Sequence, residues 1–141
     1  NEPGTYVLFF HLTEPFTISP GRLGTYRLDS GWYAYVGSAR GPGGLAARVA
    51  RHLRPTAEKR CHWHVDHLTA RVHVEHIVWT VGDDRRECQW ASRLLTLPGS
   101  SVPIPRFGAS DCTCPAHLIR LPSAAAAYQA LTTVPPGSNP G

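Results

Sequence analysis

Four side chains in this sequence are of the types that hydrolysis of a phosphodiester bond requires. Tyr35 supplies a phenol, Arg48 a guanidinium, His52 an imidazole and Glu87 a carboxylate. The reaction needs a carboxylate to hold a divalent metal ion, a cation to balance the charge that develops on phosphate, and a weak base that takes a proton from water. The residue types therefore predict a hydrolytic site, provided that the fold brings them together.

The spacing of these residues favours such convergence. Arg48 and His52 are four positions apart in a helical pattern, so they project from the same face of the helix. Tyr35 lies in a preceding strand that leads to this helix through a glycine-rich loop at 41–44. Glu87 falls in the first turn of a later helix. The alternative is that tyrosine and arginine at the edges of strands and helices only pack, with their polar tips in water.

The elements that would position these residues follow from the patterning of the sequence. Runs rich in β-branched and aromatic residues predict strands at 4–12, 32–39 and 73–81. The segment 16–28 is typical of a hairpin of two short strands. Apolar residues at helical spacing predict helices at 45–53, from about 63 to 72, and at 85–97. This order predicts a small mixed α/β domain.

The length of 141 residues is that of a single domain. We expect the domain to span residues 1–121, with a compact, turn-rich unit at 107–121. Residues 122–141 are rich in alanine, proline and glycine, and we expect them to form a flexible C-terminal tail.

Two tripeptides extend this interpretation. GTY at 4–6 and YVG at 35–37 resemble the paired motifs of the GIY-YIG nucleases, and Arg48, His52 and Glu87 follow in that family's order. The resemblance covers roughly residues 4–97. WHVDHL at 63–68 and FGASDCTCPAHL at 107–118 further resemble a small branch of the superfamily that is sometimes joined to endonuclease III-type DNA glycosylases.

The resemblance implies a small, mainly antiparallel sheet flanked by helices and a metal-dependent endonuclease acting on DNA, in repair or processing. Tyr35 would orient or deprotonate the attacking water, with Tyr6 beside it. Arg48 would bind the scissile phosphate, and His52 would assist proton transfer or hold the phosphate. Glu87 would hold one Mg²⁺ or Mn²⁺ ion, largely through water.

The chain departs from the family pattern in two places. The distance from Tyr6 to Tyr35 is longer than in the usual hairpin of the family, so residues 13–30 form an extended hairpin insertion. The asparagine that some relatives place after the metal-binding glutamate has no clear counterpart, because Gly99, Ser100 and Ser101 occupy this region.

The charge of the chain suits a polyanionic partner. The formal net charge is +4, and Lys59 is the only lysine among 14 basic residues. Arginine offers a forked set of donors to phosphate, although a biased genome composition also explains this choice. The residues expected to contact nucleic acid, single-stranded or branched DNA among the possibilities, are Ser38, Arg40, Arg51, Arg54, His62 and His64.

Cysteine and histidine form a second candidate cluster. Cys112, Cys114 and His117 give the pattern C-x-C-x-x-H, to which Cys88 could add a fourth ligand for structural Zn²⁺. Small buried cysteines that pack a loop explain the same residues without an ion. A disulfide from Cys88 to Cys112 or Cys114 is a third interpretation.

The remaining expectations concern the setting of the protein. No stretch approaches the roughly 20 apolar residues needed to cross a bilayer, and no secretory leader is visible, so we expect a cytoplasmic protein. Two alternatives to the nuclease stay open: a catalytically inactive module that binds nucleic acid, and a zinc-stabilised interaction domain. The sequence does not define the oligomeric state.

Overall fold

The computed structural model describes residues 2–19, 23–39, 43–53, 66–69, 72–82, 86–107 and 116–132 of the chain. Its centre is a four-stranded sheet with the order β5-β1-β4-β6, in which every neighbouring pair is antiparallel. The strands are β1 (Gly4–Leu12), β4 (Gly31–Ala39), β5 (Val74–Val81) and β6 (Leu118–Leu121). The predicted α/β fold with a small, mainly antiparallel sheet is confirmed.

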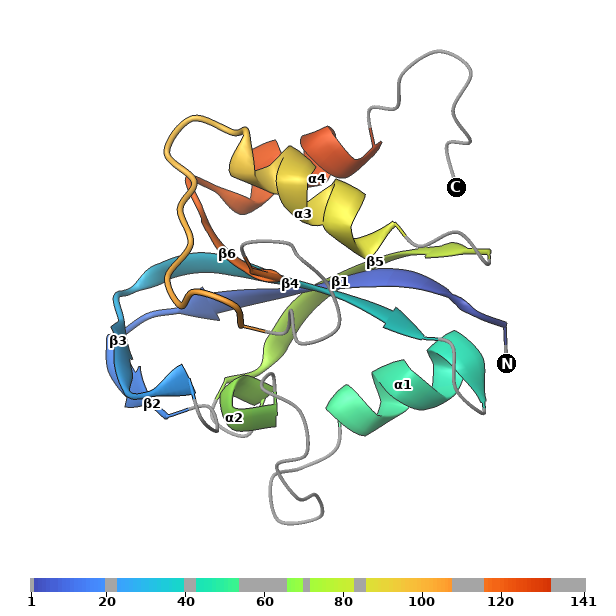
Figure 1. Cartoon of the computed structure of the whole chain (residues 1–141), viewed down its shortest axis with the longest axis horizontal. Coiled ribbons are helices and arrows are strands. Elements are labelled where there is room, and N and C mark those ends of the chain that lie inside the picture. The colour runs from blue at the N-terminus through green and yellow to red at the C-terminus, as the bar shows by residue number, and fades with distance from the viewer. Residues whose placement is uncertain are drawn as a thin grey trace.

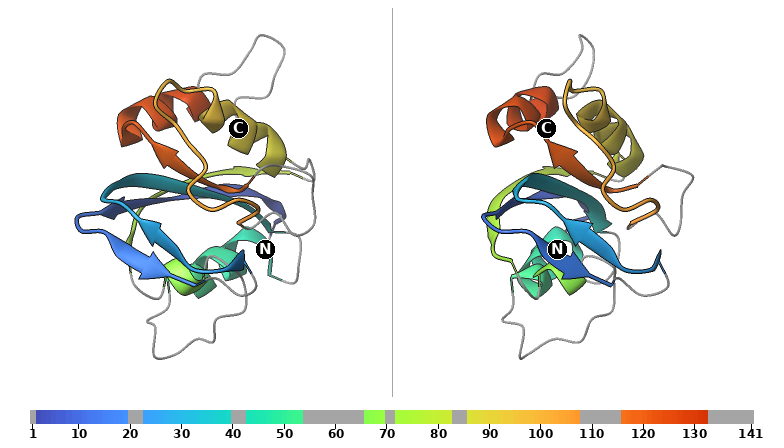
Figure 2. Two further views of the ribbon diagram at one scale, coloured as in Figure 1. Left: turned by 60° about the vertical axis from the view of Figure 1, so that its left-hand side comes forward. Right: turned by 90° about the vertical axis from the view of Figure 1, so that its left-hand side faces the viewer.

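Helices cover both faces of this sheet (Figure 1). Below the sheet in that view lie α1 (Gly44–His52) and the short α2 (Asp66–Thr69), and above it lie α3 (Glu87–Leu95) and α4 (Ala124–Thr132). The turned views keep the same three layers (Figure 2). No helix in the described ranges is long and apolar enough to cross a membrane.

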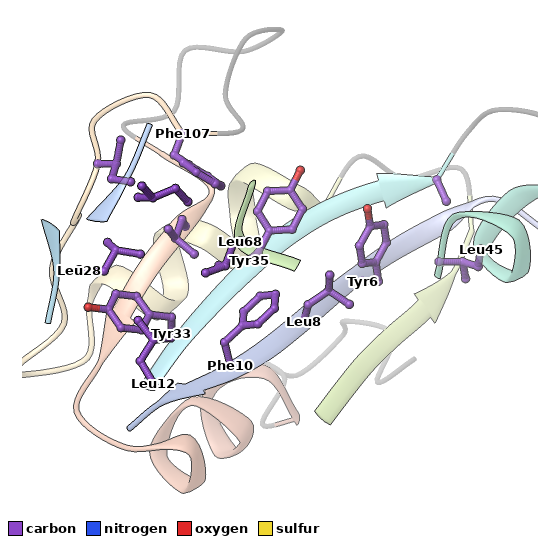
Figure 3. Close-up of a cluster of buried hydrophobic side chains, with 14 residues drawn as sticks. Tyr6, Leu8, Phe10, Leu12, Leu28, Tyr33, Tyr35, Leu45, Leu68 and Phe107 are labelled. Atoms are coloured by element: carbon purple, nitrogen blue, oxygen red, sulfur yellow. The ribbon is translucent and has the colours of Figure 1, made fainter. Parts of the chain in front are cut away.

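The central strand β1 is buried on both faces, as its continuous apolar pattern predicts. Successive side chains of a strand point to opposite faces. Tyr6, Leu8 and Phe10 therefore join a core on the α1 side, whereas Val7 and Phe9 join a second core with the apolar residues of α3 and α4. Figure 3 shows the first core, which also holds Tyr33 and Tyr35 of β4.

The insertion between β1 and β4 has a packing role. It forms the expected hairpin of β2 (Phe16–Ile18) and β3 (Tyr26–Leu28), which pair with each other in a separate two-stranded sheet. Ile18 and Leu28 are buried in the core on the α1 side, and Leu28 lies beside Leu12 and Tyr33 (Figure 3). The hairpin thus covers the end of that core that α1 does not reach.

The C-terminal third differs from the sequence-based expectation in two elements. Residues 118–121 are not only part of a turn-rich unit but form β6, which pairs with β4 from Trp32 to Tyr35. Residues 124–132 are not a flexible tail but form α4, and this prediction is corrected for them. Ala127 and Leu131, four positions apart, are buried against the second core, and this burial stabilises a helix that composition alone did not indicate.

The other predicted helices are found with adjusted bounds. The helix expected from about 63 to 72 is described as α2 over Asp66–Thr69, and residues 63–65 lie outside the described part of the chain. The helix expected at 85–97 is α3, which begins at Glu87 and ends at Leu95.

Candidate active site

The centre of the candidate site is a buried hydrogen bond between β1 and α1. The hydroxyl of Tyr6 lies 2.7 Å from Nε2 of His52, and the two ring centroids are 5.4 Å apart. Only 1% of Tyr6 and 2% of His52 is exposed. The alternation of β1 points Tyr6 toward α1, and the last turn of α1 brings His52 over it. Because buried polar groups are rarely left without partners, this bond fixes both rings.

Tyr35 completes an aromatic group on the same face. It stands on β4 beside Tyr6 on β1 (Figure 3), with ring centroids 6.5 Å apart, and its ring meets His52 edge-on at 6.3 Å. Phe107 packs against the far side of Tyr35 at 6.2 Å. The predicted convergence of Tyr6, Tyr35 and His52 is therefore found in the structure.

Gly37, the last residue of the YVG motif, makes room for this group. A Cβ atom at Gly37 would lie 2.6 Å from both Cζ and the hydroxyl oxygen of Tyr6, and 3.1 Å from Cε2 of Tyr35. Real Cβ atoms essentially never approach another atom as closely as 2.6 Å, and a distance of 3.1 Å is tighter than most Cβ contacts. The glycine is therefore required because the Tyr6 phenol lies directly against the backbone of β4.

Arg48 lies next to the aromatic group and is held at the end of β4. Its Nη1 atom donates a hydrogen bond to the carbonyl oxygen of Ser38 at 3.0 Å. Gly43, with a φ of 84°, turns the chain into α1, and the amide of Leu45 donates to the carbonyl of Glu2 at 2.8 Å. These contacts set the start of the helix, and with it the position of Arg48.

Glu87 occupies a second polar region at the start of α3. Its Oε2 atom is buried and has no hydrogen-bond partner within the described residues, although the residue as a whole is half-buried. Its neighbours there include Cys88, whose Sγ lies 3.7 Å from Nε2 of His117. Burial lowers the pKa of the His117 imidazole, the nearby Glu87 carboxylate opposes this shift, and the Arg106 guanidinium adds to it.

The two polar regions lie on opposite faces of the sheet. α1 packs in the core that contains Tyr6 and Tyr35, whereas α3 packs in the other core. In the described part of the chain, Glu87 forms no hydrogen bond or ion pair with Tyr6, Tyr35, Arg48 or His52. The assignment of Glu87 to the same site as these residues therefore stays a prediction.

The edge of β4 nevertheless connects the two regions. β6 pairs with β4 only as far as Tyr35, after which the amide of Val36 donates to the carbonyl of His117 at 2.8 Å. The amide of His117 in turn donates to the carbonyl of Phe107 at 2.7 Å. Tyr35 thus packs against Phe107 on one face of this edge, whereas Cys88 and Glu87 of α3 lie near His117 on the other.

The remaining predicted site residues lie on α1, on β4 or outside the described part of the chain. Arg51 is half-buried on α1, and Ser38 receives the Arg48 bond through its backbone. Outside the described residues lie Arg40, Arg54, His62, His64, Cys112 and Cys114. Cys88, which is described, forms a disulfide. Cys61, like Cys112 and Cys114, lies outside the described residues. A sulfur in a disulfide offers no thiolate to zinc.

No group of three or more His, Cys, Asp or Glu side chains within the described ranges could hold a metal ion. A magnesium ion does not require such a group, since it keeps several water ligands and often binds through one or two carboxylates. The buried, unpaired Oε2 of Glu87 fits this kind of ligand.

Sequence reasoning assigned no packing role to Gly37 or Phe107 and considered His117 only for zinc. Gly37 lies within the predicted strand 32–39, and its position in YVG was the available signal. Phe107 and His117 are connected to the site only through the pairing of β4 with the end of the chain, for which no local pattern exists.

This fold and this cluster define a small antiparallel α/β domain with two phenols, an imidazole and a guanidinium gathered on one face of its sheet. The chain belongs to the family described as "Domain of unknown function DUF123", whose model matches residues 5–137. Neither a search of curated proteins nor a search of solved structures gave a match.

Proposed function

We propose that this domain is a divalent-metal-dependent endonuclease that hydrolyses phosphodiester bonds in DNA. The observation that carries the proposal is the buried Tyr6–His52 hydrogen bond beside Tyr35 and Arg48. The resemblance of GTY and YVG to the motifs of GIY-YIG nucleases supports the same function. A role in DNA repair or processing follows from the resemblance to the branch joined to endonuclease III-type glycosylases.

In this proposal the phenol of Tyr35 holds the attacking water. Tyr35 is 8% exposed, more than Tyr6 or His52, so it is the member of the aromatic group that reaches solvent. The Tyr6–His52 pair packs behind Tyr35. In this proposal the pair holds the Tyr35 ring in a fixed position and does not contact the substrate. Where Tyr35 also acts as the base, it does so as the phenolate, which takes a proton from the water and becomes the neutral phenol.

Arg48 binds the phosphate in this proposal. Its guanidinium has five N–H donors, one of which goes to the Ser38 carbonyl at the end of β4. This bond directs the planar group along the edge of β4, where a phosphate oxygen can accept from the outer side. The positive charge stabilises the charge that builds up on phosphate during the reaction.

Glu87 would hold the metal ion through its buried Oε2. A bound divalent ion would polarise the phosphate and make a bound water more acidic. Glu87 flanks the edge of β4 from the α3 side, so the substrate phosphate would have to lie across this edge to meet both Arg48 and Glu87. The net charge of +4 favours the approach of a polyanion to this region.

The test is cleavage of single-stranded, branched and duplex DNA with Mg²⁺ or Mn²⁺, with EDTA as the metal-free reference. We expect Tyr35→Phe, Arg48→Ala and Glu87→Gln each to lower the cleavage rate about 100-fold or more. Tyr26→Phe, which removes a phenol hydroxyl on β3 outside the proposed set of site residues, is the matched control and should cleave at the wild-type rate.

Two results would contradict the proposal in different ways. If the Glu87→Gln variant cleaves DNA at the wild-type rate, the protein is a nuclease but Glu87 is not part of its active site. Salt-dependent binding of DNA with no product under any metal condition would instead favour the inactive nucleic-acid-binding module. A panel that includes RNA separates the two kinds of nucleic acid.

A further inference from the structure

An apolar groove lies on the side of α1 that faces away from Arg48. It has a volume of about 490 Å³ and runs between α1 and the edge strand β5. Residues from both elements line it, among them Ala46, Ala50 and Leu53 of α1 and Ile77, Trp79 and Val81 of β5. Trp79 is 60% exposed, Leu53 54% and Val81 49%. Large apolar side chains gathered at this exposure mark an interaction surface.

β5, which borders the groove, also has backbone N–H and C=O groups that point away from the sheet. In an antiparallel pair, residues that bond to the neighbouring strand alternate with residues whose N–H and C=O groups point away. The amide of Gly82 donates to the carbonyl of Pro3 at 2.9 Å, which makes this a bonded pair. Counting back along the register with β1, the bonded residues of β5 are the even-numbered ones.

The backbone groups of Ile77, Trp79 and Val81 therefore point outward from the sheet. β5 is the end of the strand order, so no described strand meets these groups. The same three residues place their side chains in the groove, since Trp79 pairs with Tyr6 and shares its face. This stretch holds no proline and no charged residue, the features that usually prevent an edge strand from pairing with another strand.

We propose that this surface binds a second copy of the chain through antiparallel pairing of the two β5 strands about a two-fold axis at Trp79. In this register Trp79 faces Trp79 of the second copy, and Ile77 faces Val81. These pairs form about six backbone hydrogen bonds. The pairing is self-complementary, because the residues that need partners on one copy are the residues that supply them on the other.

The side chains favour the same occupant. A two-fold axis perpendicular to the sheet keeps Ile77, Trp79 and Val81 of both copies on the α1 face, so each apolar set meets an identical one. The small side chains of Ala46 and Ala50 leave room beside Trp79 for the second tryptophan. The product is one continuous sheet across the dimer. β1 and its copy are then three strand spacings apart, about 14 Å.

This inference does not depend on the proposed nuclease function, and its test measures association. The molar mass by light scattering should rise with concentration from 15.4 kDa toward twice that value. In wild-type protein, the amides of Ile77, Trp79 and Val81 should exchange with solvent about tenfold more slowly once nine-tenths of the chains are dimeric, because only the monomer exposes them. The amides of Val78 and Thr80 should be protected at every concentration.

Lysine substitutions give the matched comparison. Trp79→Lys places two like charges directly opposite each other at the axis and should leave the chain monomeric. His76→Lys adds the same charge to the same strand on the other face, where His76 is exposed, and should leave the dimer intact. Unchanged circular dichroism for both variants establishes that each is folded.

Several outcomes would overturn the inference. The protein could stay monomeric at all concentrations, or form a dimer without slower exchange at the three odd-numbered positions. Slower exchange at these positions only after DNA is added would assign the surface to nucleic acid, with Trp79 as a stacking platform. A dimer that survives Trp79→Lys would place the interface elsewhere.

Discussion

The hydroxyl of Tyr6 lies 2.7 Å from Nε2 of His52, and both side chains are buried between β1 and α1. Removing the hydroxyl in Tyr6→Phe leaves a buried ring nitrogen without this partner, which should lower the free energy of unfolding by about 1–3 kcal/mol. Tyr26→Phe is the control, because the Tyr26 hydroxyl forms no hydrogen bond within the described residues. Urea unfolding of the three proteins measures the difference, and equal losses would contradict the role given to this bond.

Gly37 offers a test of how closely the phenols approach β4. Gly37→Ala places a methyl group 2.6 Å from the Tyr6 hydroxyl oxygen, so the ring must move away from His52. We expect a loss of about 1–3 kcal/mol in the free energy of unfolding. In the double variant Gly37→Ala, Tyr6→Leu the methyl group no longer meets the Tyr6 ring, and only its 3.1 Å approach to Cε2 of Tyr35 remains. The combined loss should therefore fall short of the sum of the single losses by about 0.5 kcal/mol or more, and additive losses would contradict the contact.

Local patterns predicted the part of the site that lies on two consecutive elements. Arg48 and His52 share a helix face because of their spacing, and Tyr35 precedes that helix across one loop. Their meeting therefore needs only a strand, a turn and a helix. Tyr6 was added through the resemblance of GTY and YVG to known motifs, and antiparallel pairing places it beside Tyr35.

The sequence could not determine the relation of Glu87 to this group. A helical pattern gives the apolar face of α3 but does not say which face of the sheet that helix covers, and α3 covers the face opposite α1. The same limit explains why β6 was missed. Its four residues are too few for a clear alternation, and its partner β4 lies more than 80 positions earlier.

Metal binding by Glu87 can be measured without any nuclease assay. Millimolar Mg²⁺ or Mn²⁺ should raise the midpoint of thermal unfolding by about 3–5 °C, because an ion that binds only the folded state stabilises it. Glu87→Gln should abolish this rise, since an amide is a weaker ligand than a carboxylate. Glu14→Gln changes an exposed carboxylate elsewhere and should keep the wild-type response. A rise that persists in Glu87→Gln would mean that the ion binds at another place.

The oxidation state of the cysteines separates the alternatives for Cys88. Because Cys88 forms a disulfide, a thiol reagent added in denaturant without reductant should find no more than two free thiols among the four cysteines. The Cys88→Ser variant should gain one free thiol from the released partner. Four reactive thiols, together with about one zinc ion per chain, would instead support the zinc-stabilised domain.

Tyr33 provides a prediction about alkaline pH. Burial raises the pKa of its phenol above the ordinary value of 10.0, and the negative charge of the Asp29 carboxylate raises this pKa further. The positive charge of Arg120 and the hydrogen bond to the Asp29 backbone lower it. The hydroxyl donates to the Asp29 carbonyl at 2.7 Å. Because the folded state keeps its proton longer than the unfolded state, the stability that Tyr33 contributes is complete below pH 10. It is lost as the pH rises from 10 through the higher pKa of the folded protein.

The comparison of wild type with Tyr33→Phe isolates this effect, because every other titrating group is common to both proteins. At neutral pH the variant should be less stable by about 1 kcal/mol, the contribution of one partly buried hydrogen bond. Above pH 10 ionisation of the unfolded wild-type chain offsets that advantage, whereas phenylalanine does not titrate. The difference in free energy of unfolding, measured by urea titration across this range, should therefore shrink as the pH rises. A constant difference would mean that the Tyr33 phenol ionises as readily in the folded protein as in the unfolded chain.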